Sequence, residues 1–350
     1  MKQGWEIKKI KDICDKASSN IAQNKITELN GDYPVYGASG YVQNVDFYHR
    51  DTPYIGIVKD GSGVGRVNTY PAYTSLLGTL QYILPKAGHS LSYIAYALKS
   101  LHLASFASGA AIPHIYFKDY GECTIPIPPL SEQERIVAEL DCLSSIIEKQ
   151  KEQLNELDNL VQSIFYTMFG NPITNEKGWE VKKLGDICEE LFAGGDKPKD
   201  WSEIKTELYQ YPIYANGDGD RGLLGYSKTY RVKKPAVTLG ARGASVGNCR
   251  ICEGYFTPVV RLITMVPRDL IDITYLYYSI RMFKFNVSGA GQAQLTIPNV
   301  INKEIPLPTL PLQKEFASKI EAIEKQKELI KQSIAETETL FNSRMDYYFN

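Results

Sequence analysis

The sequence predicts an α+β fold in which two similar globular domains are joined by two long helices that form an antiparallel coiled coil, with an internal pseudo-two-fold. The first observation is a duplication: residues 4–15 (GWEIKKIKDICD) return as residues 178–189 (GWEVKKLGDICE), with eight of 12 positions identical. The second is that each copy ends in a long charged segment with apolar residues at heptad spacing. The two copies begin 174 residues apart. A duplicated unit of this length predicts two related domains, and hence a target with two parts.

Each domain is expected to combine short strands with one helix. Runs rich in β-branched and aromatic residues alternate with glycine-rich turns, and a helical pattern follows in each copy. The predicted domains are residues 1–130 and 170–308, the predicted strands are residues 52–58, 80–84, 236–240 and 259–265, and the predicted domain helices are residues 91–103 and 273–285.

The two long segments, residues 131–169 and 309–350, have the 4-3 apolar spacing of a coiled coil. Nine of ten seam positions in the first are apolar, with Gln150 as the exception, and Lys327 interrupts the second seam. Either residue would be costly to bury against an apolar partner. We therefore predict a register with Gln150 opposite Lys327, in which paired residue numbers add up to 477. The alternative is that each helix packs only on its own domain.

Composition and charge limit the function classes. The 350 residues are 43% hydrophobic and 23% charged, with a net charge of −1, as in a globular protein. Acidic residues are concentrated in the first long segment, whereas the domains carry +2 and +3; such a domain binds a phosphate backbone only if its cations share one face. No apolar stretch is typical of a signal peptide or a membrane span, so we expect a cytoplasmic location. The six scattered cysteines do not indicate a disulfide framework.

Sequence motifs of catalysis are not found. The chain has no GxxxxGK[ST] loop, no HExxH and no paired zinc-binding clusters. Cys249 and Cys252 form a single CxxC without a second pair, and GSGVG at residues 61–65 is better explained as a tight glycine turn than as a dinucleotide site. We therefore expect a non-enzyme with no metal and no cofactor of its own.

Three loops that occur in both copies have the residue types of a DNA-binding surface. Glycines expose backbone N–H groups, cations contact phosphate or guanine, and amides read base edges. The loops are residues 33–41 with 211–219, residues 59–66 with 240–250, and residues 108–114 with 288–294. The alternatives are that the tyrosines belong to a buried hairpin and that the cations are merely solvated. The candidate DNA-binding residues are Tyr36, Ser39, Lys59, Ser62, Arg66, His114, Tyr214, Asn216, Arg242, Ser245, Arg250, Gln292 and Gln294.

The order of these motifs resembles a known family. YPVYGASG and YPIYANGD, the SGAAIPHI element, and the helix entries IPIPPLSEQERI and IPLPTLPLQKEF are similar to those of the specificity subunit of type I restriction-modification systems. The resemblance covers the whole chain. It implies two target-recognition domains, each reading one half of an interrupted double-stranded DNA sequence, and two helices that hold these domains apart.

The resemblance also implies partners. The specificity subunit of that family is not catalytic and assembles with two methyltransferase subunits, which methylate adenine using S-adenosylmethionine, and with restriction subunits that use ATP and Mg. No membrane partner is expected. One alternative is the recognition module of a single-methyltransferase system, or a silent cassette. Another is a coiled-coil protein-interaction scaffold without DNA specificity.

Overall fold

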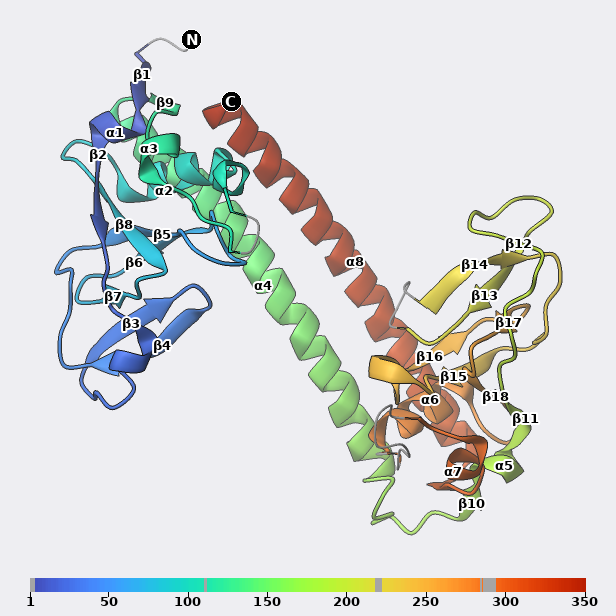
Figure 1. The fold of residues 1–350 in the computed structure, drawn as a ribbon. Coiled ribbons are helices and arrows are strands. Elements are labelled where there is room, and N and C mark those ends of the chain that lie inside the picture. The colour runs from blue at the N-terminus through green and yellow to red at the C-terminus, as the bar shows by residue number, and fades with distance from the viewer. Residues whose placement is uncertain (1–3, 110–111, 218–221, 284, 286–293) are drawn as a thin grey trace. The chain divides into compact units, whose positions relative to one another are not determined.

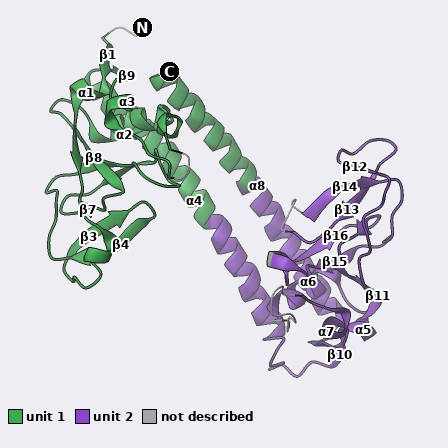
Figure 2. Ribbon diagram, in the orientation of Figure 1, with its two compact units in different colours: residues 1–152, 331–350 green, residues 153–330 purple. Residues whose placement is uncertain are grey.

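The computed structural model describes all residues except 1–3, 110–111, 218–221, 284 and 286–293 (Figure 1). The chain divides into two compact units (Figure 2). Unit 1 comprises Met1–Glu152 together with Lys331–Asn350, and unit 2 is the continuous stretch Gln153–Ile330. Each unit therefore contains one globular domain and a segment of each long helix.

The domain of unit 1 is built on an antiparallel sheet with the strand order β2-β8-β5-β6. A second sheet, β4-β3-β7, contains one antiparallel and one parallel pairing, and β1 pairs with β9. Apolar side chains from the first sheet and from α2 pack together and form the core of the domain. The bounds are β1 Glu6–Lys9, α1 Ile10–Ile13, β2 Cys14–Ser18, β3 Tyr33–Gly37, β4 Gly40–Val45, β5 Tyr54–Val58, β6 Val67–Tyr70, β7 Ser75–Leu76, β8 Leu80–Pro85, α2 Leu91–Ser100, α3 Phe117–Tyr120 and β9 Thr124–Ile127.

Unit 2 repeats this topology. Its main sheet has the order β11-β18-β15-β16, its second sheet is β12-β14-β13-β17, and β10 pairs with β19. The same strand order in both units confirms the predicted duplicated α+β fold, and β12 is an additional edge strand. The bounds are β10 Val181–Lys183, α5 Leu184–Ile187, β11 Cys188–Ala193, β12 Trp201–Ser202, β13 Tyr211–Tyr214, β14 Leu223–Ser227, β15 Ala236–Leu239, β16 Cys249–Cys252, β17 Thr257–Pro258, β18 Ile263–Pro267, α6 Ile273–Met282, α7 Ile297–Ile301 and β19 Glu304–Pro306.

One of the predicted strands is shifted along the chain. The prediction of residues 259–265 began too early, because β18 starts only at Ile263. Val260 and Arg261 have positive φ values of 53° and 64°. Residues other than glycine rarely adopt this backbone conformation, and a β-strand does not accommodate it. The chain therefore turns before it enters the sheet.

The long helices are α4 (Leu130–Phe169) and α8 (Leu310–Phe349). In unit 1 the beginning of α4 and the end of α8 are part of the domain's core, and in unit 2 the end of α4 and the beginning of α8 pack in the same way. The heptad seams thus contribute to a coiled coil and also cover the domains. Within the described residues, no helix is long and apolar enough to span a membrane.

The antiparallel pairing of the helices is confirmed, but the predicted register is wrong. In unit 1 Gln150 Nε2 donates to Ser333 Oγ over 2.7 Å, so paired residue numbers add up to 483. In unit 2 Lys327 Nζ lies 2.8 Å from a carboxylate oxygen of Asp158, which gives 485. The helices are displaced by about one heptad from the prediction. This register supplies a hydroxyl to Gln150 and an opposite charge to Lys327, whereas an amide opposite an ammonium group leaves the charge without a counterion.

A buried glutamine fixes the start of each long helix. Gln133 Oε1 accepts a hydrogen bond from Ser90 N, which precedes α2, and Gln133 Nε2 donates to the Pro128 carbonyl. Gln313 makes the corresponding bonds to Asp272 N and the Pro308 carbonyl. Both glutamines are at most 1% exposed. Sequence reasoning missed this device, although a glutamine follows the helix-entry prolines in both copies.

Candidate nucleic-acid interface

The first loop pair is a hairpin in unit 1. Tyr36 is half-buried in β3, where its ring lies 5.0 Å from Tyr70 and 6.3 Å from Tyr41. Ser39 is exposed at the tip between β3 and β4. The structure therefore places Tyr36 partly in the core, as the alternative interpretation proposed, and leaves Ser39 accessible to a ligand.

The corresponding loop of unit 2 begins at β13. Tyr214 packs 5.8 Å from Phe256, and the guanidinium of Arg250 lies 5.3 Å from its ring. Asn216 Oδ1 accepts a hydrogen bond from Ala241 N at 2.8 Å, and its Nδ2 donates to the Val260 carbonyl at 2.7 Å. Asn216 thus ties the first loop to the second. Among the described residues, these two bonds use one N–H and one lone pair of the amide and leave the others for a base.

The second and third loops of unit 1 meet at one backbone bridge. Asp60 pairs with His114, and Ile115 N donates to the Lys59 carbonyl at 3.0 Å. The side chains also meet there, because His114 Nδ1 is hydrogen-bonded to an Asp60 carboxylate oxygen. Lys59 Nζ lies 3.9 Å from the other oxygen. The His114 ring packs 4.1 Å from Tyr116, which is exposed. Asp60 was missed in the sequence, where it stands beside Lys59 and offsets that residue's charge.

The same bridge in unit 2 carries different chemistry. Arg242 pairs with Gln294, and Leu295 N donates to the Ala241 carbonyl at 2.9 Å. Arg242 therefore occupies the position of Asp60, and Gln294 that of His114. An acid and an imidazole in one unit are replaced by a guanidinium and an amide in the other.

The remaining candidates surround these bridges. Arg66 and Ser62 are exposed, and Arg66 Nε donates to the Gly63 carbonyl at 3.3 Å. Ser245 ends a short 3₁₀ turn after Arg242. Arg250, on β16, donates to the Gly217 carbonyl at 2.7 Å. Gln292 lies outside the described residues. The structure thus brings together Asn216, Arg242, Arg250 and Gln294 through bonds between their loops, whereas Ser39 is at the hairpin tip.

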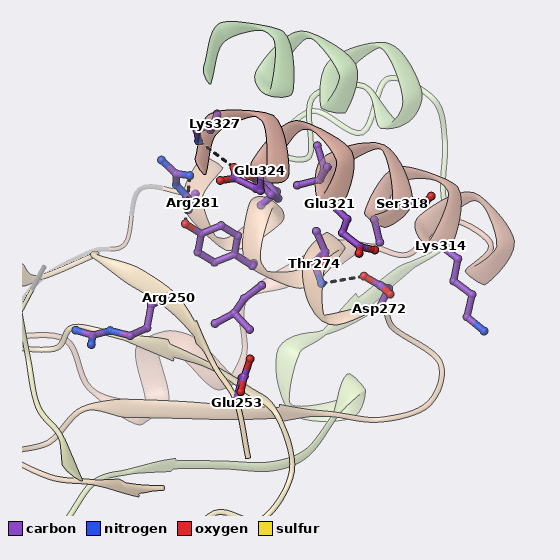
Figure 3. A pocket seen from close by; sticks show the side chains of 15 residues that line it. Arg250, Glu253, Asp272, Thr274, Arg281, Lys314, Ser318, Glu321, Glu324 and Lys327 are labelled. Atoms are coloured by element: carbon purple, nitrogen blue, oxygen red, sulfur yellow. Dashed lines mark hydrogen bonds and ion pairs between the residues drawn. The ribbon is translucent and has the colours of Figure 1, made fainter. Parts of the chain in front are cut away.

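A hollow of about 890 Å³ lies beside Arg250 in unit 2, between β16, α6 and α8 (Figure 3). Its charges are mixed. Lys327 Nζ lies 2.9 Å from Glu324, Arg281 donates to the Tyr277 hydroxyl at 3.3 Å, and Asp272 caps α6 (Figure 3). Because acidic and basic groups alternate on its walls, this hollow lacks the uniform positive charge that a phosphate backbone requires.

The cysteines do not form a reactive pair in the described chain. Cys249 and Cys252 are free thiols on β16. Three residues along a strand place their side chains on opposite faces. Burial also raises the pKa of Cys252, so its thiol is protonated at neutral pH. Among the residues that the structure describes, no three His, Cys, Asp or Glu side chains are grouped so that they could hold a metal ion.

Two copies of one fold, each with polar loops joined at a common bridge, define a binding protein with two related recognition domains. The model of the type I restriction modification DNA specificity domain matches residues 2–159 and again residues 176–339. The chain belongs to this family: it is a DNA-specificity subunit of a type I restriction-modification system, a subunit that is not itself an enzyme.

Curated relatives agree over most of their length. Two putative type I specificity subunits of Mycoplasma pneumoniae are 28% identical over 90% of this chain and 88% of the relative, and 31% identical over 74% and 80%. The specificity subunit of a type I restriction enzyme from Methanocaldococcus jannaschii is 25% identical over 91% of this chain and 86% of its own.

Solved structures agree in fold. The type I S subunit from M. genitalium superposes with a TM-score of 0.65 at 17% identity, covering 99% of this chain and 96% of the other. A chain from a study of complex assembly and conformational transition of the type I system gives a TM-score of 0.59, also at 17% identity, with coverage of 99% and 97%.

Proposed function

We propose that residues 1–130 and 170–308 are target-recognition domains, and that each reads one half of an interrupted DNA sequence through the loops described above. The observation that carries this proposal is the shared bridge with exchanged side chains: Asp60 with His114 in unit 1, and Arg242 with Gln294 in unit 2. A common framework with different polar groups at its tips is what two unlike half-sites require.

The two bridges favour different bases. In unit 1 the carboxylate of Asp60 bonds to His114 Nδ1. In the neutral tautomer that has its proton on Nδ1, Nε2 is an acceptor for the amino group of cytosine or adenine. In unit 2 Arg242 has the donors that match O6 and N7 of guanine, and Gln294 has the donor and acceptor that match adenine. The other cations, Lys59, Arg66 and Arg250, suit phosphate contacts that position the domains without reading sequence.

Partner subunits complete the proposed activity. The domains carry only +2 and +3, so their salt-dependent attraction to DNA is modest. In this proposal two methyltransferase subunits supply further affinity and methylate adenine with S-adenosylmethionine, and restriction subunits use ATP and Mg. The complex would act in the cytoplasm. Support comes from the family match and from the structural likeness to a chain whose study concerns assembly of the type I system.

Sequencing of adenine methylation in a host that expresses this chain with its neighbouring methyltransferase tests the proposal. We expect a two-part interrupted motif in the wild type. Arg242→Ala should relax one half of the motif and weaken binding by about 1–3 kcal/mol. Lys182→Ala is the matched control. Lys182 is a cation of the same domain that lies on β10, outside the candidate loops, and is ion-paired with Glu180.

Three results would contradict the proposal in different ways. If Arg242→Ala weakens binding equally to all DNA sequences, Arg242 contacts phosphate and does not read a base. A wild-type complex that assembles but methylates no new motif would favour a silent cassette. Binding of protein partners without any dependence on salt or DNA sequence would favour the coiled-coil scaffold.

A further inference from the structure

A cluster of three tyrosines recurs in both units. Its first member begins the first candidate loop of each unit, and the other two lie outside the candidate DNA-binding loops. In unit 1 the ring of Tyr48 lies edge-on to two others, at centroid distances of 4.8 and 5.2 Å and interplanar angles of 66° and 89°. In unit 2 the corresponding values are 4.9 and 5.0 Å, and 69° and 87°. We call these clusters the tyrosine triads: Tyr33, Tyr48 and Tyr73 in unit 1, and Tyr211, Tyr230 and Tyr255 in unit 2.

The last tyrosine of each triad has a strained backbone. Tyr73 has a φ of 60° and Tyr255 a φ of 64°. Glycine adopts this left-handed conformation freely, whereas a bulky side chain does so only at a cost. Both units nevertheless place a tyrosine there, just before β7 and β17. Strain retained at the same place in two repeats indicates that the ring has a use.

Four of the six rings are exposed, so packing of the core does not account for them. Tyr48 and Tyr73 are 41% and 53% exposed, and Tyr230 and Tyr255 are 40% and 46% exposed. Tyrosine gives a large contact area at a small cost in side-chain entropy, and it is enriched at the centres of protein interfaces. Two matching exposed triads thus have the character of contact surfaces.

The triad of unit 1 is poorly suited to DNA. Tyr33 opens β3 and Tyr48 follows β4, so the triad of unit 1 lies at the opposite end of the hairpin from the tip at Ser39. Three exposed acids and one cation, Arg50, adjoin it in the sequence, whereas the triad of unit 2 adjoins two cations that are ion-paired with Asp200 and Glu190. The two units therefore share the rings but not the charge, and the acids of unit 1 would repel a phosphate backbone. These flanking residues are Asp32, Asp46 and Asp51 in unit 1, and Lys228 and Arg231 in unit 2.

We propose that the tyrosine triads are twin docking surfaces for two identical protein partners, namely the two methyltransferase subunits. A surface that both repeats retain, while their DNA-facing tips differ, must meet the same partner surface twice. This inference rests on the proposed function, which provides a protein partner in two copies. The triads add a contact on each recognition domain to whatever surfaces of the long helices the partners use.

Glycine substitutions of the strained tyrosines test the inference in the full-length chain. Tyr73→Gly and Tyr255→Gly remove the ring and relieve the backbone, so the fold should persist in thermal unfolding. We expect each variant to lose roughly 30-fold in affinity for one methyltransferase subunit, the effect of an interface hot spot. Native mass spectrometry at limiting concentration should then show one bound methyltransferase for each single variant, none for the double variant and two for the wild type.

His102→Gly is the matched control, because His102 also has a positive φ, of 47°, but lies outside the triad. It should bind two methyltransferase subunits. Full assembly of the double variant would overturn the inference. Loss of DNA binding by the isolated variants with assembly intact would also overturn it, since the triads would then be DNA contacts. If even the wild type neither assembles with the methyltransferase nor methylates a motif, the proposed function itself fails.

Discussion

In both units the domain packs on its segments of the long helices with the same backbone fold, but the side chains at this contact differ. In unit 2 an aromatic cluster closes the contact: Phe169 lies 4.7 Å from Tyr275, and Phe165 lies 5.6 Å from Phe316. Two of the four equivalent positions in unit 1 are not aromatic, and a polar network lies beside them. The equivalent residues of unit 1 are Met345, Phe349, Ile136 and Tyr93.

The polar network of unit 1 joins α4 to α8. Arg344 Nη2 donates to a Glu139 carboxylate oxygen at 3.0 Å, and the Tyr348 hydroxyl donates to the same carboxylate at 2.7 Å. Arg135 Nη2 donates to the Tyr348 hydroxyl at 3.2 Å. The duplicated backbone therefore tolerates either apolar packing or a charged network at the same junction. Stability, salt sensitivity and pH response should differ between the units although their folds agree.

The largest expected difference comes from the aromatic cluster. Phe165→Ala should destabilise unit 2 by about 3–5 kcal/mol, because it opens a cavity among fully buried rings. Met345→Ala, the equivalent change in unit 1, should cost about 2–3 kcal/mol, since a flexible side chain at the rim leaves a smaller void. Hydrogen exchange of amides in β15 and β5 reports each unit separately. Equal loss of protection in both strands after either change would show that the units do not respond independently.

The buried glutamines Gln133 and Gln313 make the same hydrogen bonds in both units, so their loss should have the same effect in each. Gln133→Ala and Gln313→Ala each leave a backbone N–H and a carbonyl without partners, so each should cost about 2 kcal/mol in its own unit. Urea unfolding combined with hydrogen exchange measures this cost. The exposed Gln332, which bonds only to Glu336 among its described contacts, is the control and should change little when replaced by alanine. A neutral Gln133→Ala variant would mean that water replaces the lost bonds.

A smaller effect is expected at the bridge of unit 1. Asp60→Asn should weaken the orientation of His114 and cost about 1 kcal/mol in DNA binding, which is the typical value of one hydrogen bond. Methylation sequencing should show relaxation of a single half-site, and the half-site relaxed by Arg242→Ala should keep its sequence. If both half-sites change together, the two bridges do not read DNA separately.

The smallest effect is a dependence on acid that only the junction of unit 1 should show. The hydrogen bond from Arg344 lowers the pKa of Glu139 below its ordinary value of 4.5. A lowered folded-state pKa stabilises the folded state above pH 4.5, and this contribution is lost as the pH falls through the folded pKa. The hydrogen-exchange protection factors of amides near the end of α8 should therefore fall below pH 4.5, while those of α4 near Phe165 should not respond. Glu139→Gln should abolish the difference between the two ends.

Much of the architecture follows from patterns that are local in the sequence. Heptads, glycine turns and a twelve-residue repeat at residues 4–15 predict the two domains and the antiparallel helices. The heptad pattern could not predict the register of those helices. Ser333 and Asp158, which are the hydrogen-bond partners of Gln150 and Lys327, are not among the seam residues. Polar partners that decide a register are found only when both helices are in place.

The candidate site shows the same limit. Glycine and cation spacing indicated the three loop pairs, and the structure joins the second loop to the third in both units. The sequence pattern did not indicate Asp60, because the charge of Asp60 is balanced by its neighbour Lys59. The tyrosine triads were also missed, because their members lie 15 and 25 residues apart in unit 1 and meet only through strand pairing.

The discontinuity of unit 1 also bears on the order of synthesis. A ribosome makes the chain from its N-terminus at about 5–20 residues per second. Unit 2 is one continuous stretch and is complete before Lys331 is added, whereas unit 1 waits for Lys331–Asn350. The domain made first is therefore the last to be finished. Until then the α4 residues Ile136 and Leu140 lack the α8 side chains that cover them, so the nascent chain presents an apolar face on which a chaperone can act.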